Sequence, residues 1–137
     1  MRFKGKISVS WCVGLVAMNV ILCIFNISLG SRKYGWLLLV LWLLLDVYSI
    51  PAFFRNYVEV TKKEVRICFG ILTRKIPTAE IQALKEIVGV RSAFSASSEC
   101  IGIISKTIET TYVSVKEPKE LSKELIRLNR KIKFFIV

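Results

Sequence analysis

The sequence predicts a membrane α+β protein, in which a hairpin of two transmembrane helices precedes a small antiparallel β-sheet or barrel domain with a C-terminal α-helix. Residues 1–54 are dominated by two long apolar segments, whereas residues 55–137 are charged and contain short runs in which polar and apolar side chains alternate. Near the C-terminus this alternation gives way to the spacing of an amphipathic helix. We therefore expect two units, a transmembrane hairpin (1–54) and a cytoplasmic domain (55–137).

The composition agrees with this division. Hydrophobic residues make up 53% of the 137 residues, more than the roughly 45–50% that is typical of soluble globular domains. The excess lies before residue 55. The rest of the chain is therefore long enough for one small domain with a modest core.

Two segments are long and apolar enough to cross a membrane as helices. Residues 7–29 contain no charged side chain, and residues 34–54 contain one, Asp46. Because a spanning helix needs about 20 residues, both segments suffice. The polar residues 30–33 between them predict a tight turn, and Pro51 with the polar pair after residue 54 is expected to close the second span.

The first apolar segment has an alternative interpretation as a cleaved signal peptide. Basic residues precede it, and Ser28 and Gly30 would suit a cleavage site. The apolar region of a signal peptide has about 7–15 residues, however, and this segment is longer. A retained helix is therefore favoured.

Positive charge near the helix ends predicts the orientation, because flanks rich in Lys and Arg stay in the cytoplasm. The turn between the spans has two basic residues, and each of the other two flanks has three: Arg2, Lys4 and Lys6 before the first span, and Arg55, Lys62 and Lys63 after the second. Both termini are therefore expected to be cytoplasmic, with the domain in a reducing compartment.

Asp46 is the most unusual residue of the apolar third. A carboxylate within a span costs roughly 2.5–3.5 kcal/mol on insertion scales, and such residues often face a partner. Asp46 lies about 12 Å along a helix from Phe54, and Asn19 lies at comparable depth in the first span. Two interpretations remain open: a structural hydrogen bond between Asp46 and Asn19, or contact between Asp46 and a partner membrane protein.

Beyond residue 56, six short runs are typical of β-strands in meander order: residues 57–60, 65–69, 72–76, 83–88, 100–105 and 110–115. Gly70 supplies a permissive backbone for the reversal after the second run. Pro77 ends the third run, and Thr78 is expected to cap a short helical turn whose Ile81 points to the core. Residues 89–99 are expected to form a loop.

The C-terminal region has the pattern of a helix that packs on the sheet. Pro118 is typical of a first helical position. One apolar stripe follows at helical spacing, formed by Leu121, Leu125, Leu128 and Ile132. For the apolar residues 134–137 two positions remain open, on the sheet or in the membrane interface.

The charge and the residue types limit the chemistry. The net charge of +11 suits an anionic partner, such as the inner leaflet or an acidic protein, or else a merely solvated surface. Histidine is absent, which removes the commonest general base and metal ligand. With neither a nucleophile elbow nor a phosphate loop, we expect no enzyme, no metal and no cofactor. Nucleic acid is not expected, because the basic residues are interleaved with Glu and no aromatic platform stands out.

The four cysteines have no metal-binding spacing. We interpret them as small buried apolar residues. A disulfide between Cys68 and Cys100 would require an oxidising compartment.

A meander of short strands closed by a C-terminal helix is the plan of the pleckstrin-homology (PH) superfold. The local matches are the runs YVEVT (57–61), FGILTRKIP (69–77), EI (80–81), RSAFSAS (91–97) and VKEP (115–118). With two apolar segments before it, nearly the whole chain resembles the YyaB-like bacterial PH domains, short proteins with two N-terminal membrane helices and one PH-like domain. The resemblance implies a multi-pass protein of the bacterial plasma membrane without catalytic residues.

We expect one of two functions. The first is a non-enzymatic interaction or regulatory module at the inner leaflet, whose candidate partners are anionic lipid, a membrane protein and a second copy of the chain. Its candidate contact surface consists of Lys62, Lys63, Arg66, Arg74, Lys75 and Arg91. The alternative is self-immunity against a membrane-active, leaderless-type bacteriocin, because small basic two-helix proteins with PH-like domains resemble immunity partners of such peptides.

Overall fold

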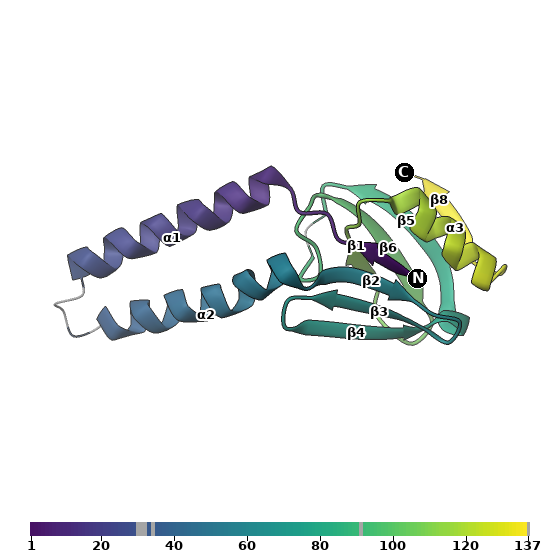
Figure 1. The fold of residues 1–137 in the computed structure, drawn as a ribbon, viewed down its shortest axis with the longest axis horizontal. Helices are drawn as coiled ribbons and strands as arrows, with labels where there is room; N and C mark the ends of the chain where they lie inside the picture. Colours follow the sequence, from purple (N-terminus) through teal and green to yellow (C-terminus); the bar gives the residue numbers. More distant parts are fainter. Residues whose placement is uncertain (30–32, 34, 91, 137) are drawn as a thin grey trace.

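Two long helices extend from one end of a domain built of two β-sheets (Figure 1). The computed structural model describes residues 1–29, 33, 35–90 and 92–136. The helices are α1 (Val9–Leu29) and α2 (Gly35–Phe54), so both apolar helices are confirmed within one or two residues of their expected bounds. Pro51 does not end α2, which continues through it to Phe54. Of the turn expected at residues 30–33, Lys33 lies in a turn. Residues 30–32 and the start of the second segment at residue 34 lie outside the described residues.

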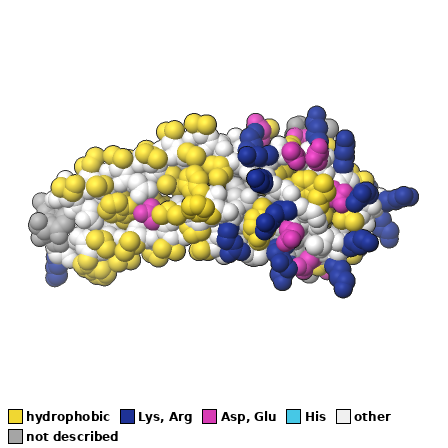
Figure 2. Space-filling view, viewed as in Figure 1, with side chains coloured by type: hydrophobic (Ala, Val, Ile, Leu, Met, Phe, Trp, Pro, Cys, Tyr) yellow, Lys and Arg dark blue, Asp and Glu magenta, His cyan; other side chains and the backbone are white. Residues whose placement is uncertain are grey.

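Exposed apolar side chains cover most of this helical hairpin, and most of the charged side chains gather over the sheets (Figure 2). Within the described part of the chain, two helices are long and apolar enough to cross a membrane. Each contains about 20 residues, and at 1.5 Å per residue this corresponds to about 30 Å, the thickness of a hydrocarbon core.

The first sheet is antiparallel and contains a strand that the sequence analysis missed. Its order is β1-β2-β3-β4, with bounds β1 (Arg2–Lys4), β2 (Asn56–Val60), β3 (Glu64–Phe69) and β4 (Leu72–Pro77). The sequence predicts residues 2–6 as the basic flank of the transmembrane unit, whereas β1 pairs with β2 in the sheet. A run of three alternating residues is too short to predict a strand from the sequence. These residues form a strand because they pair with β2.

The second sheet has the order β7-β6-β5-β8. Its strands are β5 (Ile81–Val88), β6 (Glu99–Ser105), β7 (Thr111–Val113) and β8 (Lys133–Ile136). The expected antiparallel arrangement holds for β5, β6 and β7, but β8 lies parallel to β5. This pairing answers the question left open for the C-terminal apolar residues, since residues 133–136 lie on the sheet.

A 3₁₀ turn, η1 (Thr78–Glu80), leads from the first sheet to the second. The expected short turn is confirmed, and Ile81 is buried. Thr78 does not cap it, because its hydroxyl donates to the Thr61 carbonyl at 3.3 Å.

Helix α3 (Pro118–Leu128) closes the domain. It begins at the expected proline but ends at Leu128, so Ile132 lies beyond the helix although it is buried. The Asn129 amide donates to the Thr78 carbonyl at 2.9 Å, which ties the end of α3 to the crossover between the sheets. The inner faces of both sheets and α3 share one apolar core, whose fully buried members include Val65, Ile67, Ile76, Leu84, Ile103, Leu121 and Leu125.

Gly70 forms the turn between β3 and β4, as the sequence predicts, directly against the end of α2. Its φ of 58° lies in the left-handed region, and its N–H donates to the Arg55 carbonyl at 2.7 Å. A Cβ at this position would lie 3.1 Å from the backbone nitrogen of Ala52. Both the backbone conformation and the close approach therefore require glycine.

We predict that Gly70→Ala destabilises the protein by about 1–2 kcal/mol, because alanine is strained in this conformation. In thermal unfolding of the detergent-solubilised chain, this corresponds to a melting temperature lower by about 5–10 °C. Gly14→Ala is the matched control, since Gly14 lies in α1 with open space around it. An unchanged melting temperature for Gly70→Ala would contradict the close packing of this turn on α2.

Candidate functional site

The helices and the sheets meet in an aromatic cluster. Phe69, at the end of β3, is 1% exposed. Its ring lies 6.4 Å from that of Trp11 in α1 and 6.2 Å from that of Tyr48 in α2, and Trp11 also packs on Phe53 at 5.4 Å. Trp11 therefore packs between helix and sheet. The cluster couples both helices to the first sheet.

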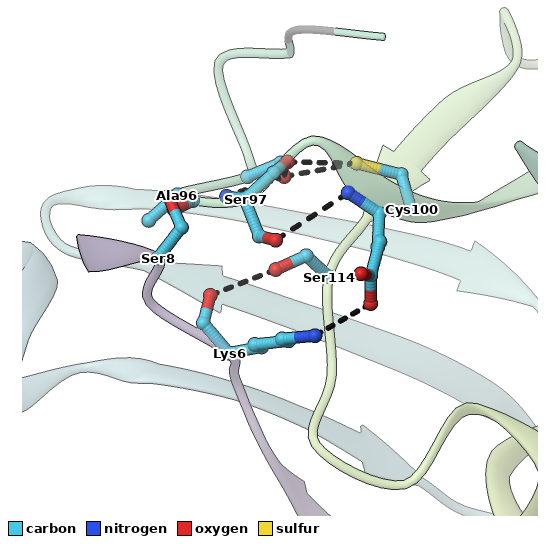
Figure 3. A network of polar contacts seen from close by, with 8 residues as sticks. Lys6, Ser8, Ala96, Ser97, Cys100 and Ser114 are labelled. Atoms are coloured by element: carbon cyan, nitrogen blue, oxygen red, sulfur yellow. Dashed lines mark hydrogen bonds and ion pairs between the residues drawn. The ribbon is translucent and has the colours of Figure 1, made fainter. Parts of the chain in front are cut away.

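A polar network anchors the start of α1 (Figure 3). The Ser8 hydroxyl accepts from the Trp11 N–H at 3.2 Å, as an N-cap does, and the Ser8 N–H donates to the Ala96 carbonyl at 2.8 Å. The Ser114 hydroxyl donates to the Lys6 carbonyl at 2.8 Å. The segment between β1 and α1 is thereby held against the loop before β6 and the chain after β7.

Cys100 belongs to the same region. Its sulfur lies 3.2 Å from the Ser97 carbonyl and 3.0 Å from the Ser95 hydroxyl. Burial raises the pKa of this thiol, and the contact with Ser95 offsets part of the rise. All four cysteines are free thiols, so the Cys68–Cys100 disulfide is not formed. Cys68 and Cys100 are buried as expected, whereas Cys12 and Cys23 are half-buried.

The structure does not bring the six candidate basic residues together. Lys62 and Lys63 lie in the exposed turn between β2 and β3, at the end of the sheet away from the helices (Figure 1). Lys75 is exposed and lies opposite Arg66 in the register of β3 and β4. Arg91 lies outside the described residues.

Two of these residues are engaged within the domain. Arg66 forms an ion pair with Glu64 at 2.9 Å, and this hydrogen-bonded contact raises the pKa of the guanidinium. Arg74 donates to the Thr111 hydroxyl at 2.9 Å and lies over the Phe94 ring at 4.9 Å. Its side chain therefore joins the two sheets.

Asn19 and Asp46 do not form the hydrogen bond that was one of the two interpretations. Asn19 accepts from the Trp42 indole at 2.6 Å and donates to the Leu15 carbonyl at 3.1 Å. Asp46 is half-buried on α2, and among the described residues no group forms a hydrogen bond or an ion pair with its carboxylate.

Two cavities flank the junction of helices and sheets. The first, of about 460 Å³, lies between the two helices and the loop before β6. Its hydroxyl groups come from Ser8, Ser10, Tyr48, Ser49, Ser92, Ser95, Ser97 and Ser98. The second, of about 470 Å³, lies between β1, the start of β2 and the end of α2. The three charged residues that line it are basic: Arg2, Lys4 and Lys116.

No group of His, Cys, Asp and Glu suited to a metal ion occurs among the described residues. Compared with protein-family models, with curated proteins and with solved structures, the chain has no significant match in any of the three.

The sequence does not predict the junction at which α1 and α2 contact the sheets. The Ser8 cap could have been found, because serine directly before an apolar helix is an N-terminal signal. No local sequence pattern indicates that Lys4 and Lys116 lie side by side. These distant residues are brought together by the backbone, where the Lys116 N–H donates to the Lys4 carbonyl at 3.0 Å.

We predict that Cys100 resists alkylation in the folded protein. Its thiol is buried and its pKa is raised, so both access and thiolate formation are reduced. In a variant with Cys100 as the single cysteine, labelling at pH 8 should be slower than in denaturant by on the order of tenfold or more. Ser98→Cys, with Cys100 also replaced, is the exposed control two residues away, in the loop before β6. Equal rates at the two positions would contradict the buried environment.

Proposed function

We propose that the protein is a non-enzymatic, membrane-anchored interaction module. Its two helices span a bacterial plasma membrane, and a PH-like domain lies against the cytoplasmic leaflet. The observation that carries the proposal is the connection between helices and sheet. Helix α2 continues through Arg55 into β2, β1 precedes α1 by a short segment, and β1 and β2 are paired.

This connection supports a common side for both termini. Because β1 and β2 are neighbours in one sheet, the ends of the helices that they join are held at the same level. Arg2, Lys4, Lys6 and Arg55 lie at these ends, and Lys33 lies at the opposite end of the hairpin. The larger positive charge on the sheet side favours a cytoplasmic domain.

The order of the elements supports the PH-like part of the proposal. Strands β2 to β4 and strands β5 to β7 each form an antiparallel meander, η1 joins the two sheets, and α3 closes the domain. Two features add to this plan: β1, which precedes the helices, and β8, which follows α3. An experiment on the soluble domain therefore needs the N-terminal residues as well, because a fragment that starts at residue 55 lacks the edge strand β1.

The rigid junction suits an interaction module. A protein that contacts the helices within the membrane displaces the aromatic cluster around Phe69, and through it the first sheet. Asp46 is the candidate contact residue, because a carboxylate that has no partner among the described residues is costly in a span and gains most from a polar group on another protein.

The orientation has a direct test. We predict that Lys33→Cys is labelled in intact cells by a membrane-impermeant maleimide, and that Lys63→Cys is labelled only after permeabilisation. Both variants carry alanine at the four native cysteines, and both positions are exposed. Labelling with the opposite pattern would refute a cytoplasmic domain. Extraction of the protein by alkaline carbonate would refute the spanning hairpin.

The partner has a second test, in-membrane crosslinking and pull-down of the tagged full chain beside Asp46→Asn. We expect a specific membrane protein to be captured with the wild type, and its capture to be reduced by on the order of tenfold with the variant, because the variant lacks the carboxylate that is proposed to contact the partner. Asp46→Asn combined with Asn26→Asp, on the other helix, tests whether any carboxylate in a span suffices. Capture that is unchanged by Asp46→Asn would exclude this contact. The absence of a protein partner in both forms would favour a lipid as the only partner of the module, or the immunity function.

A further inference from the structure

The second cavity has a basic side and an apolar side. Arg2 and Lys4 come from β1, and Lys116 comes from the segment between β7 and α3. Phe53 and Phe54 belong to the last turn of α2. Residues from three distant parts of the chain therefore meet at the level where the second candidate span ends.

The three basic side chains are available to a ligand. No acidic residue lines the cavity, and the ion pairs among the described residues use three other basic groups, Lys6, Arg66 and Arg127. The Arg2 guanidinium lies 3.7 Å from the centre of the Tyr57 ring, which orients it by a cation–π contact. All three side chains are exposed. Their concentrated positive charge suits an anion.

The apolar side of the cavity indicates a ligand that is larger than a small anion and has an apolar part. Phe54 is 83% exposed and Phe53 is 46% exposed. Two phenyl rings beside three cations fit a ligand with an anionic head and an apolar body. A helix as long as α2 matches the hydrocarbon core, so its last turn lies at the edge of that core and the basic groups lie at the level of the lipid headgroups.

We propose that this cavity binds the phosphate headgroup of an anionic phospholipid in the leaflet that faces the sheets. Arg2, Lys4 and Lys116 contact the phosphate oxygens, and the acyl chains lie along Phe53 and Phe54. Asn56 also lines the cavity, and its side-chain amide nitrogen, which has no hydrogen-bond partner among the described residues, is a further donor. This inference rests on the proposed function, because the lipid reaches the cavity only if the helices span the membrane.

The test uses the full chain in uncharged detergent, with phosphatidylglycerol or phosphatidylcholine added to the micelles, and the melting temperature as readout. A ligand that binds the folded state raises the melting temperature, and the stabilisation grows with the logarithm of the ligand concentration divided by Kd. We expect stabilisation by phosphatidylglycerol and little by phosphatidylcholine. In Lys4→Gln/Lys116→Gln the apparent affinity for phosphatidylglycerol should fall about 30-fold, since each basic residue near an anionic surface contributes about 1 kcal/mol.

Lys62→Gln/Lys63→Gln is the matched control, because it removes the same charge from an exposed turn at the far end of the sheet. It should keep the affinity of the wild type. An equal loss in both double variants would overturn the cavity in favour of general surface attraction. Equal stabilisation by the two lipids would overturn recognition of the anionic head. Inorganic phosphate or glycerol 3-phosphate acting as well as phosphatidylglycerol would overturn the lipid as the ligand.

Two further measurements keep the proposal falsifiable. If the double variant does not fold, Arg2→Gln replaces it, and an unchanged affinity in that variant would count against the site. Resistance to carbonate extraction is measured on the same protein. A chain that stays in the membrane but shows no preference for phosphatidylglycerol refutes the lipid site alone, whereas a chain that is extracted refutes the spanning hairpin on which the site depends.

Discussion

The pairing of β1 with β2 is the constraint on which the rest of the structure depends. These strands are the continuations of α1 and α2, and their backbone hydrogen bonds hold the two helix ends together. Gly5 extends the connection, because its N–H donates to the Asn56 carbonyl and it forms a bridge with Val115. A movement of one helix relative to the other must therefore disturb the sheets, which makes the hairpin and the domain one mechanical unit.

Side-chain packing completes this junction in two chemically different ways. On one side the aromatic rings around Phe69 fill the space between helices and sheet, where their contacts gain from burial and from edge-to-face geometry. On the other side serine hydroxyls satisfy backbone groups at the start of α1 and in the loop before β6. The apolar contacts supply stability, and the polar contacts determine where the first helix leaves the domain.

The basic residues fall into groups with different environments, which the net charge of the chain does not distinguish. Arg66 and Arg74 act within the domain, through Glu64 and Thr111 respectively. Lys62 and Lys63 are solvated at the far end of the sheet. Arg2, Lys4 and Lys116 gather beside the end of α2 without an acidic neighbour in the cavity. A net charge of +11 is therefore less informative than the position of three side chains at the level where lipid headgroups are expected.

The sequence by itself determined the two apolar helices, the strands β2 to β7 and the start of α3, because these follow from patterns within short windows: uninterrupted apolar runs, alternation, and glycine or proline at turns. Only the tertiary structure decided the strand formed by Arg2–Lys4, the parallel pairing of β8, the bond from Trp42 to Asn19 and the basic cavity. Each of these joins residues far apart in the chain. Local patterns carry no information about such contacts, which arise when the sheets close around a shared core and bring distant segments to one helix end.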